Sequence, residues 1–195
     1  MFTEPTLTDT SIRDALAAFS SSDPTPGGGS AAALASALGT SLLIMVSGLA
    51  KTRTGAESER GALAGTMPAL VDLRDQLTRA IDADRAAYDA VVAAYKLPKT
   101  SPDEQESRKA AIQRALRAAT DVPLDVVRLS ARALAAADIV AANGHAAAAS
   151  DVGVAIALLR AGRQGARLNV DINLNGLHDE AYVATTRAEI ERLTG

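Results

Sequence analysis

Among the residues of this sequence that could transfer a proton, Asp84 has the most unusual setting. Between Glu57 and Lys96, apolar residues recur at alternating spacings of four and three, and Asp84 lies inside that apolar stripe. A carboxylate at such a position is exposed by a local groove, paired with a neighbouring arginine, or functional. Asp82 and Asp89 lie outside the stripe, and we expect both to be solvated.

The segment Pro24–Thr25–Pro26–Gly27–Gly28–Gly29–Ser30 could bind a ligand through its backbone. Prolines fix the entry of the chain, and glycines let a backbone come close to another group. Backbone N–H groups at the start of a helix could cradle an anion or a flat ligand, but the glycines could equally serve only a tight turn and close packing. The pattern is neither a P-loop nor a dinucleotide-binding fingerprint.

Other polar candidates lie near predicted helix ends. Lys51 and Lys99 could reach into a cleft, but for each lysine taken alone we favour a structural explanation, a helix-dipole partner for Lys51 and a solvated loop charge for Lys99. Asn169 and Asn173 are four residues apart, so one helix face could present both to a heterocyclic ligand, or both could bond to backbone at a frayed helix end. Asp151 is also explained as a helix cap.

The elements that must position these residues are helices. Caps, apolar periodicity and breakers predict helices over about 11–19, 30–50, 57–96, 102–140, 152–170 and 179–193. Ser30 is expected to cap the second of these, and Pro123 to kink or break the fourth. Residues 170–174 are the only strand candidate. We therefore predict an all-α fold, a bundle of about five to seven helices including long antiparallel ones, in a single domain over 1–195.

Composition agrees with this fold and excludes several kinds of function. Aromatic residues make up 3% of the 195 residues, so the core must consist of Ala, Leu, Val and Ile, which favours helices. A net charge of −3 argues against nucleic-acid binding. The chain has no cysteine and only two histidines, so we expect no disulfide and no metal site.

The uncharged stretch 27–50 is long enough to span a bilayer. Small and hydroxyl-bearing residues interrupt it, and alanine gains little in lipid, so we expect a buried central helix instead. Met1–Asp14 does not have the pattern of a signal peptide. The expected location is therefore cytoplasmic, with no membrane partner.

Six segments, in the same order along nearly the whole chain, resemble the C-terminal domain family of formiminotransferase-cyclodeaminase. They are Pro24–Leu34, Asp82–Val91, Leu97–Thr100, Ala119–Leu124, Ser150–Ala155 and Gly165–Leu174. The resemblance implies an all-helical homodimer that acts on one-carbon derivatives of tetrahydrofolate by proton transfer, without a metal or cofactor. Family members either close 5-formiminotetrahydrofolate to 5,10-methenyltetrahydrofolate with release of ammonia, or add water to the methenyl carbon to give 10-formyltetrahydrofolate.

The resemblance also implies roles for individual residues. Asp84, with a raised pKa, and Lys99 would be the catalytic groups. The loop Gly27–Ser30 would approach the substrate by its backbone. Side chains that would contact the substrate are Asp151, Asn169 and Asn173 in the pocket, and Lys51 or Arg53 at the carboxylates of the folate glutamate tail.

Two segments depart from the family pattern. Ala50–Gly55 carries fewer charges than the usual Gly-Lys-Lys-Lys-Tyr-like stretch, and Gly144–Ala147 lacks the two asparagines of the usual Gly-Asn-x-Asn. These departures leave a non-catalytic dimeric helical module as an alternative. With no formiminotransferase domain to supply the formimino substrate, we predict a methenyltetrahydrofolate cyclohydrolase, with formimidoyltetrahydrofolate cyclodeaminase as the second choice.

Overall fold

The computed structural model describes residues 6–194, so both ends of the predicted domain 1–195, residues 1–5 and 195, lie outside this part. The elements are η1 (Leu7–Asp9), α1 (Ile12–Phe19), α2 (Gly28–Ser47), α3 (Glu57–Tyr95), α4 (Pro102–Asn143), η2 (Ala146–Ala148), α5 (Ala149–Leu174) and α6 (Glu180–Thr194). Over residues 6–194 the chain contains six α-helices and no strand, which confirms the all-α prediction. Residues 170–174 are the last turn of α5, so the strand candidate was wrong.

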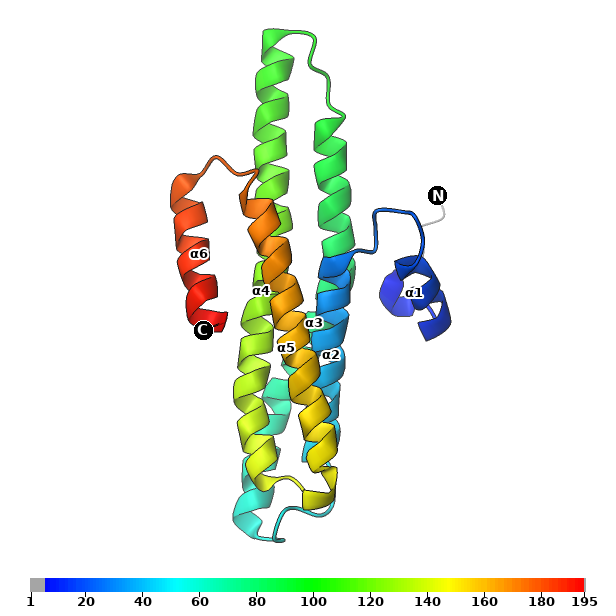
Figure 1. Ribbon diagram of the computed structural model, residues 1–195, viewed down its shortest axis with the longest axis vertical. Helices are drawn as coiled ribbons and strands as arrows, with labels where there is room; N and C mark the ends of the chain where they lie inside the picture. Colours follow the sequence, from blue (N-terminus) through cyan, green and yellow to red (C-terminus); the bar gives the residue numbers. More distant parts are fainter. Residues whose placement is uncertain (1–5, 195) are drawn as a thin grey trace.

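Helices α2, α3, α4 and α5 form an antiparallel bundle in which each helix packs against the next and α5 packs back on α2 (Figure 1). Leucine, valine and alanine fill the core, among them Leu43, Leu70, Leu77, Val127 and Leu159. In the described part of the chain, α2 is the one helix long and apolar enough to cross a membrane, and 56% of that stretch is buried inside the bundle. The sequence-based prediction of a buried central helix is therefore confirmed.

Helices α2 and α5 approach each other closely because small residues face each other across the contact. A Cβ atom on Gly162 would lie 2.0 Å from Ser36 Oγ and 2.6 Å from the Ala32 carbonyl oxygen. Ser36 itself is fully buried and forms a hydrogen bond to Ser130 on α4, with 2.8 Å between the two hydroxyl oxygens. The backbone of α2 is therefore held firmly in the bundle, which fixes where its first turn lies.

Helices α3 and α4 extend well beyond the other two. They contain 39 and 42 residues, whereas α2 contains 20. At 1.5 Å per residue, α3 and α4 are roughly 60 Å long and α2 is about 30 Å long. The upper part of the molecule is consequently a two-helix hairpin that projects past the start of α2, with the α3–α4 turn at its tip (Figure 1).

Four positions at predicted helix boundaries differ in outcome. Ser101 caps α4 in a capping box with Glu104, and Ser11 caps α1, as the sequence indicated. The prediction that Ser30 caps α2 was wrong, because Gly27 is the N-cap and Ser30 lies buried in the first turn. Of the kink or break predicted at Pro123, the break does not occur, because α4 continues through this proline.

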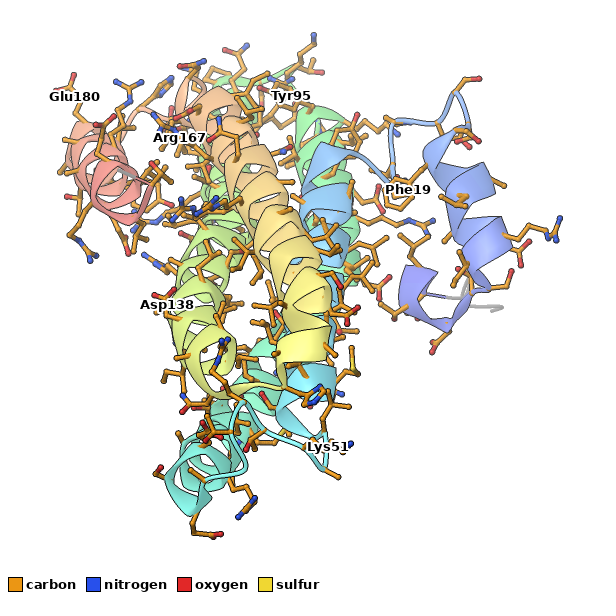
Figure 2. The ribbon with its side chains drawn as sticks, turned by 60° about the horizontal axis from the view of Figure 1, so that its bottom comes forward. Phe19, Lys51, Tyr95, Asp138, Arg167 and Glu180 are labelled. Carbon is orange, nitrogen blue, oxygen red and sulfur yellow. The ribbon has the colours of Figure 1, made fainter. Side chains whose placement is uncertain are left out.

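The terminal helices lie on opposite sides of the bundle, as the labelled residues Phe19 and Glu180 show in Figure 2. Helix α6 covers a small apolar cluster formed by Leu124, Val170, Leu174 and Ile190. Ion pairs hold it in place, notably Arg128 with Glu189 at 2.6 Å. Helix α1 is different, because none of its residues is buried.

Candidate active site

A cavity of about 310 Å³ opens where α2 begins, beside the projecting part of the α3–α4 hairpin and the last turns of α5. Its lining comprises Pro24, Thr25, Gly27, Gly28, Gly29, Asp84, Tyr88, Val91, Leu116, Ala119, Asn169, Ile172 and Asn173. The cavity exists because α2 ends where α3 and α4 continue. The structure thus brings together the glycine loop, Asp84 and both asparagines, from three separate regions of the chain.

Asp84 is bonded to the first turn of α2. Its Oδ2 accepts hydrogen bonds from the backbone N–H of Ser30 at 2.8 Å and from the Ser30 hydroxyl at 2.9 Å. The N-cap Gly27 has no side chain to satisfy the free N–H groups of this turn, so a carboxylate from α3 does so instead. A negative charge at this position is also favoured by the helix dipole. No salt bridge of Asp84 occurs among the described residues, so pairing with an arginine does not explain it.

Gly29 has no side chain because the Asp84 carboxylate occupies that space. A Cβ atom on Gly29 would lie 2.1 Å from Asp84 Oδ1 and 2.5 Å from its Cγ. Any side chain at position 29 would therefore push the carboxylate away from Ser30. The sequence left open whether the glycines serve packing or a ligand, and the structure shows that Gly29 allows α2 to approach Asp84 while the loop lines the cavity.

Burial raises the pKa of Asp84 above its ordinary value of 3.8, although the two hydrogen bonds from Ser30 act in the opposite direction. Removing a carboxylate from water penalises its charged form, and here this effect is larger than that of the two donors. A carboxyl group of this kind holds its proton at higher pH than a solvated aspartate. It is therefore suited to exchange a proton with a bound ligand.

The Ser30 hydroxyl can serve both protonation states of Asp84. Its oxygen lies 2.9 Å from the Ile81 carbonyl oxygen and 2.9 Å from Asp84 Oδ2, yet the hydroxyl has a single hydrogen to donate. When Asp84 is ionised, Ser30 donates to Asp84. When Oδ2 carries a proton, Asp84 donates to Ser30 and Ser30 donates to Ile81. The pair can thus gain or lose a proton without moving a heavy atom.

Asn169 and Asn173 both use their amide N–H groups within the protein. Asn169 Nδ2 donates to the Gly165 carbonyl at 2.9 Å, and Asn173 Nδ2 donates to the Ala119 carbonyl at 2.8 Å. In each case the amide oxygen remains as an acceptor, and both residues line the cavity. The sequence-based expectation that one helix face presents both asparagines is confirmed.

Pro123 explains the bond that orients Asn173. A proline has no N–H, so the carbonyl four residues before it in a helix has no partner in the usual pattern. That carbonyl belongs to Ala119, and the Asn173 amide supplies the missing hydrogen. Helix α4 therefore continues through Pro123, and the Ala119 carbonyl that Pro123 leaves without a helical partner holds the Asn173 side chain in place at the cavity. Sequence reasoning noticed Pro123 but not its carbonyl partner, which lies on another helix.

Lys99 does not reach this cavity within one chain. It lies in the turn between α3 and α4, beyond Tyr95. Tyr95 is eleven residues above Asp84, which corresponds to about 16 Å along the helix. The expectation that Lys99 lies beside Asp84 is thus not met in a single copy.

Lys51, Arg53 and Asp151 lie at the other end of the bundle. Lys51 and Arg53 follow the last turn of α2, whose 20 residues span about 30 Å, and Asp151 is in the first turn of α5. Figure 2 shows Lys51 at the end of the bundle opposite to Tyr95. Here Lys51, Arg53 and His145 border a separate hollow. These residues cannot contact a ligand that is bound at Asp84 of the same chain.

Arg53 has a role in the fold at this second end. Its guanidinium donates to the carbonyl oxygens of Ala141 and Ala142, the last residues of α4 that lack helical partners. Glu59 fixes the same loop, because its carboxylate accepts hydrogen bonds from the Thr52 hydroxyl and from the N–H groups of Thr54 and Gly55. Sequence reasoning missed Glu59, for which an acidic residue in the first turn of α3 was the only signal.

Tyr88, Leu116 and Ile172 are cavity residues that the sequence did not single out. Tyr88 follows Asp84 by one helical turn in the same apolar stripe, and that spacing could have indicated it. Leu116 and Ile172 read as ordinary apolar helix positions. Residues 6–194 contain no group of three or more histidine, aspartate or glutamate side chains that could hold a metal ion.

Comparison with known proteins places this arrangement in a family. The model of the formiminotransferase-cyclodeaminase family matches residues 11–192. The methenyltetrahydrofolate cyclohydrolase of Methylorubrum extorquens is 40% identical over 182 residues, which cover 93% of this chain and 88% of that protein. The formimidoyltransferase-cyclodeaminase of Rattus norvegicus is 34% identical over 97% of this chain, but the match covers only 35% of the rat protein.

The fold leads to the same family. The crystal structure of formiminotetrahydrofolate cyclodeaminase from Thermotoga maritima superposes with a TM-score of 0.83 and 28% sequence identity. The superposition covers 95% of this chain and 88% of that one. The family match extends over the glycine loop, Asp84 and both asparagines of the cavity. The chain therefore belongs to the formiminotransferase-cyclodeaminase family.

Proposed function

We propose that this protein hydrolyses 5,10-methenyltetrahydrofolate to 10-formyltetrahydrofolate, as a methenyltetrahydrofolate cyclohydrolase. The observation that carries the proposal is the half-buried Asp84 carboxylate, bonded to Ser30 in a cavity with acceptor groups suited to a heterocycle. The Methylorubrum relative bears this name, and the chain covers most of its length. The protein is thus an enzyme of folate one-carbon chemistry.

The proposed reaction needs one group that first accepts and then returns a proton. Ionised Asp84 removes a proton from the attacking water while the water oxygen bonds to the methenyl carbon. The tetrahedral carbon then loses its bond to N5, and protonated Asp84 gives its proton to that nitrogen. The hydroxyl on the carbon becomes the formyl carbonyl and releases one proton to solvent. Ser30 stays bonded to Asp84 in both states.

The charge of the cavity favours this substrate. Among the described residues that line it, Asp84 is the only charged one. The methenyl bridge is a cation delocalised over N5 and N10, so a partly desolvated carboxylate beside it attracts it more strongly than one in bulk water would. The positive charge is lost in the product, which weakens that attraction after the reaction.

The two asparagines are proposed to recognise the pterin ring. Their amide oxygens accept hydrogen bonds, and a pterin presents N–H donors on its ring and its exocyclic amine. The bonds from Asn169 to Gly165 and from Asn173 to Ala119 fix both amides in this orientation. Tyr88, Val91 and Leu116 provide apolar surface for the flat ring system.

A homodimer is part of the proposal, because one chain exposes a long uncharged helical surface. Helix α2 contains no charged residue, and its outer side exposes Leu34, Leu38 and Met45. On α5 the neighbouring exposed stripe contains Val154, Leu168 and Ile172. An apolar surface of this extent, which we call the α2–α5 face, is typical of a protein interface.

A second copy would also give the distant candidates a role. If two copies pack antiparallel through the α2–α5 face, the Lys51 end of one lies beside the Asp84 end of the other. We propose that Lys51 then attracts the glutamate-tail carboxylates of substrate bound to the partner copy, while Arg53 supports its loop. Asp151 lies at the same end as Lys51. Lys99 lies at the hairpin tip, beyond Tyr95, so this arrangement gives it no contact with the substrate.

The proposed reaction takes place in the cytoplasm and uses neither a metal nor a cofactor. Each step is a proton transfer or a bond change at one carbon, and Asp84 with Ser30 can carry the proton. The net negative charge gives no basis for nucleic-acid binding.

Cyclodeamination of 5-formiminotetrahydrofolate is the second candidate. The rat and Thermotoga proteins carry that activity in their names. The chemistry again passes through a tetrahedral carbon between N5 and N10, with a proton delivered to the leaving ammonia, so the same Asp84 and Ser30 would serve.

The direct test follows the absorbance of the methenyl chromophore with and without protein. We expect loss of the chromophore well above the buffer rate, and we expect Asp84→Asn to lower kcat by roughly 10²- to 10⁴-fold, the usual contribution of a positioned acid or base. Asp89→Asn is the matched control, because it removes an exposed carboxylate from the same helix. If only the formimino substrate reacts, the protein is a cyclodeaminase. If neither substrate reacts, it is a non-catalytic module.

A further inference from the structure

Helix α1 is amphipathic but does not bury its apolar side. Ile12, Ala15, Leu16 and Phe19 share one face, at the spacing of successive helical turns. Ile12 and Leu16 are 82% and 63% exposed, and no residue of α1 is buried. Figure 1 shows α1 beside α2, standing apart from the bundle. An eight-residue helix has little stability of its own, so this apolar face needs a packing partner.

A groove of about 410 Å³ separates this face from the bundle. Ile12, Leu16 and Phe19 form one wall, and Leu34 and Leu38 of α2 lie in the other. Both walls are therefore apolar, and the groove between them has room for further side chains.

The position of α1 is fixed even though its apolar face is open. Asp82 accepts hydrogen bonds from the Leu7 N–H at 2.7 Å and from the Thr8 hydroxyl at 2.6 Å, so the expectation that Asp82 is merely solvated was wrong. Ser11 then caps α1 through the N–H of Asp14. These bonds tie the segment before α1 to α3, which holds α1 at a set distance from α2.

The groove is continuous with the α2–α5 face, since Leu34 and Leu38 belong to both. On α5 the outward side chains Val154, Leu158, Leu168 and Ile172 keep a spacing typical of one helix packed along another. This surface therefore suits an uncharged, helical occupant. A second copy of this chain presents such a surface.

The dimensions agree with this occupant. The α2–α5 face is about 30 Å long and two helices, or about 20 Å, wide, which gives roughly 600 Å² per copy. A stable interface buries about 800 Å² per partner. Helix α1 lies beside this surface, so its apolar face adds area where the interface would otherwise be small.

We propose that α1 is a fixed arm that packs on a second copy, so that side chains of the partner's α2–α5 face fill the groove between α1 and α2. The inference rests on the homodimer of the proposed function and adds the segment that clasps it. It also links the dimer to the site, because Asp82, which anchors the segment before α1, lies two residues before Asp84.

The test compares two neighbouring substitutions on opposite faces of α1. Leu16→Asp introduces a charge into the groove, whereas Ala17→Asp introduces the same residue on the opposite, exposed side. By sedimentation equilibrium of the full chain, we expect Leu16→Asp to raise the dimer Kd at least tenfold and Ala17→Asp to change it less than twofold. Three results would disprove the proposal that α1 packs on a second copy. They are equal effects of the two substitutions on the dimer Kd, an unchanged dimer Kd for Leu16→Asp, and a wild-type chain that stays monomeric.

A second measurement applies even if Leu16→Asp disturbs folding. Because the chain has no cysteine, Leu16→Cys and Ala17→Cys can each carry a single environment-sensitive dye. Dilution through dimer dissociation should change the emission of the dye at position 16 and leave position 17 nearly constant. Constant emission at both positions contradicts the arm. The chromophore assay is separate, so a catalytically active dimer with an unresponsive α1 disproves the arm alone.

Discussion

Helix α3 carries a carboxylate near each end of α2, and the two are used in opposite ways. Asp84 bonds the first turn of α2 through Ser30, and Glu59 bonds the loop that follows α2 through Thr52, Thr54 and Gly55. Asp84 thus satisfies an N–H group that the start of α2 leaves free, and Glu59 satisfies N–H groups of the loop between α2 and α3. Asp84 lines the cavity at the start of α2, and Glu59 lies at the loop that follows α2.

The difference lies in their water contact. Desolvation is a minor effect at Glu59, so its hydrogen bonds, that from Thr52 most of all, lower its pKa to about 2. Asp84 is half-buried and has only Ser30 as a partner, so burial dominates and raises its pKa. Hydrogen bonds that outweigh desolvation keep the Glu59 carboxylate charged, whereas burial that outweighs hydrogen bonds lets Asp84 hold and release a proton.

Apart from the loss of Asp84 itself, the largest effect on activity is expected from Gly29→Ala. A Cβ atom there would overlap the Asp84 carboxylate and separate it from Ser30. We expect kcat/KM to fall roughly 10²-fold, as when a reacting group is misplaced by about 1 Å. Stability should fall by about 1–3 kcal/mol, the usual cost of overpacking. The measurements are the chromophore assay and urea unfolding.

Gly153→Ala is the control for this substitution. Gly153 is also helical, but its Cβ would meet no atom within 4 Å. We expect unchanged activity and a gain of about 0.5–1 kcal/mol from the higher helix propensity of alanine. If Gly29→Ala behaves like Gly153→Ala, the close contact with Asp84 has no role in catalysis.

A smaller effect should appear in the pH dependence of stability. The pKa of Asp84 is higher in the folded protein than its ordinary 3.8, so this group lowers stability as pH rises above that value. The pKa of Glu59 is lower in the folded protein, so its stabilisation is present above pH 4.5 and is lost as pH falls from 4.5 to about 2. The two carboxylates therefore act with opposite sign.

Thermal unfolding of Asp84→Asn and Glu59→Gln between pH 2 and 8 tests whether the two carboxylates have opposite effects on the pH dependence of stability. Asp84→Asn should gain in Tm relative to the wild type as pH rises from 4 to 7, while Glu59→Gln should lose in Tm above pH 4.5 and match the wild type near pH 2. Parallel pH profiles for the two variants would contradict the assignment of burial to one carboxylate and hydrogen bonding to the other.

The smallest expected effect concerns Pro123→Ala. Alanine restores an N–H that can bond the Ala119 carbonyl within α4, in competition with the Asn173 amide. We expect KM to rise about threefold to tenfold with kcat nearly unchanged, since a lost or loosened neutral hydrogen bond is worth about 0.5–1.5 kcal/mol. Asn173→Ala should give a similar KM.

The double variant supplies the check on that explanation. If Pro123 acts through Asn173, the effects of Pro123→Ala and Asn173→Ala should not add, because both remove the same interaction. Additive effects on KM would mean that the proline influences the cavity by another route.

Much of the fold could be predicted from the sequence because its signals are local. Apolar spacing and caps located every helix, with the ends of α1, α3 and α4 within a few residues. Errors arose where a residue's partner is distant in the sequence. Ser30 was predicted to cap α2, but its hydroxyl donates to Asp84 on α3. Pro123 was predicted to kink or break α4, but the Asn173 amide bonds the Ala119 carbonyl that Pro123 leaves without a helical partner. No pattern within one helix reveals such partners.

The sequence by itself determined an all-helical chain, the family to which it belongs, and Asp84 as the residue out of place on an apolar stripe. Periodicity and residue type suffice for the helices and for Asp84 because they depend on neighbours along the chain, whereas the family was indicated by the resemblance of six ordered segments. Only the tertiary structure decided that Gly29, Ser30 and Asp84 meet, while Lys51 and Asp151 lie some 30 Å away along α2 and α5. Helix lengths and packing set these distances, and burial against a helix end sets the affinity of Asp84 for its proton.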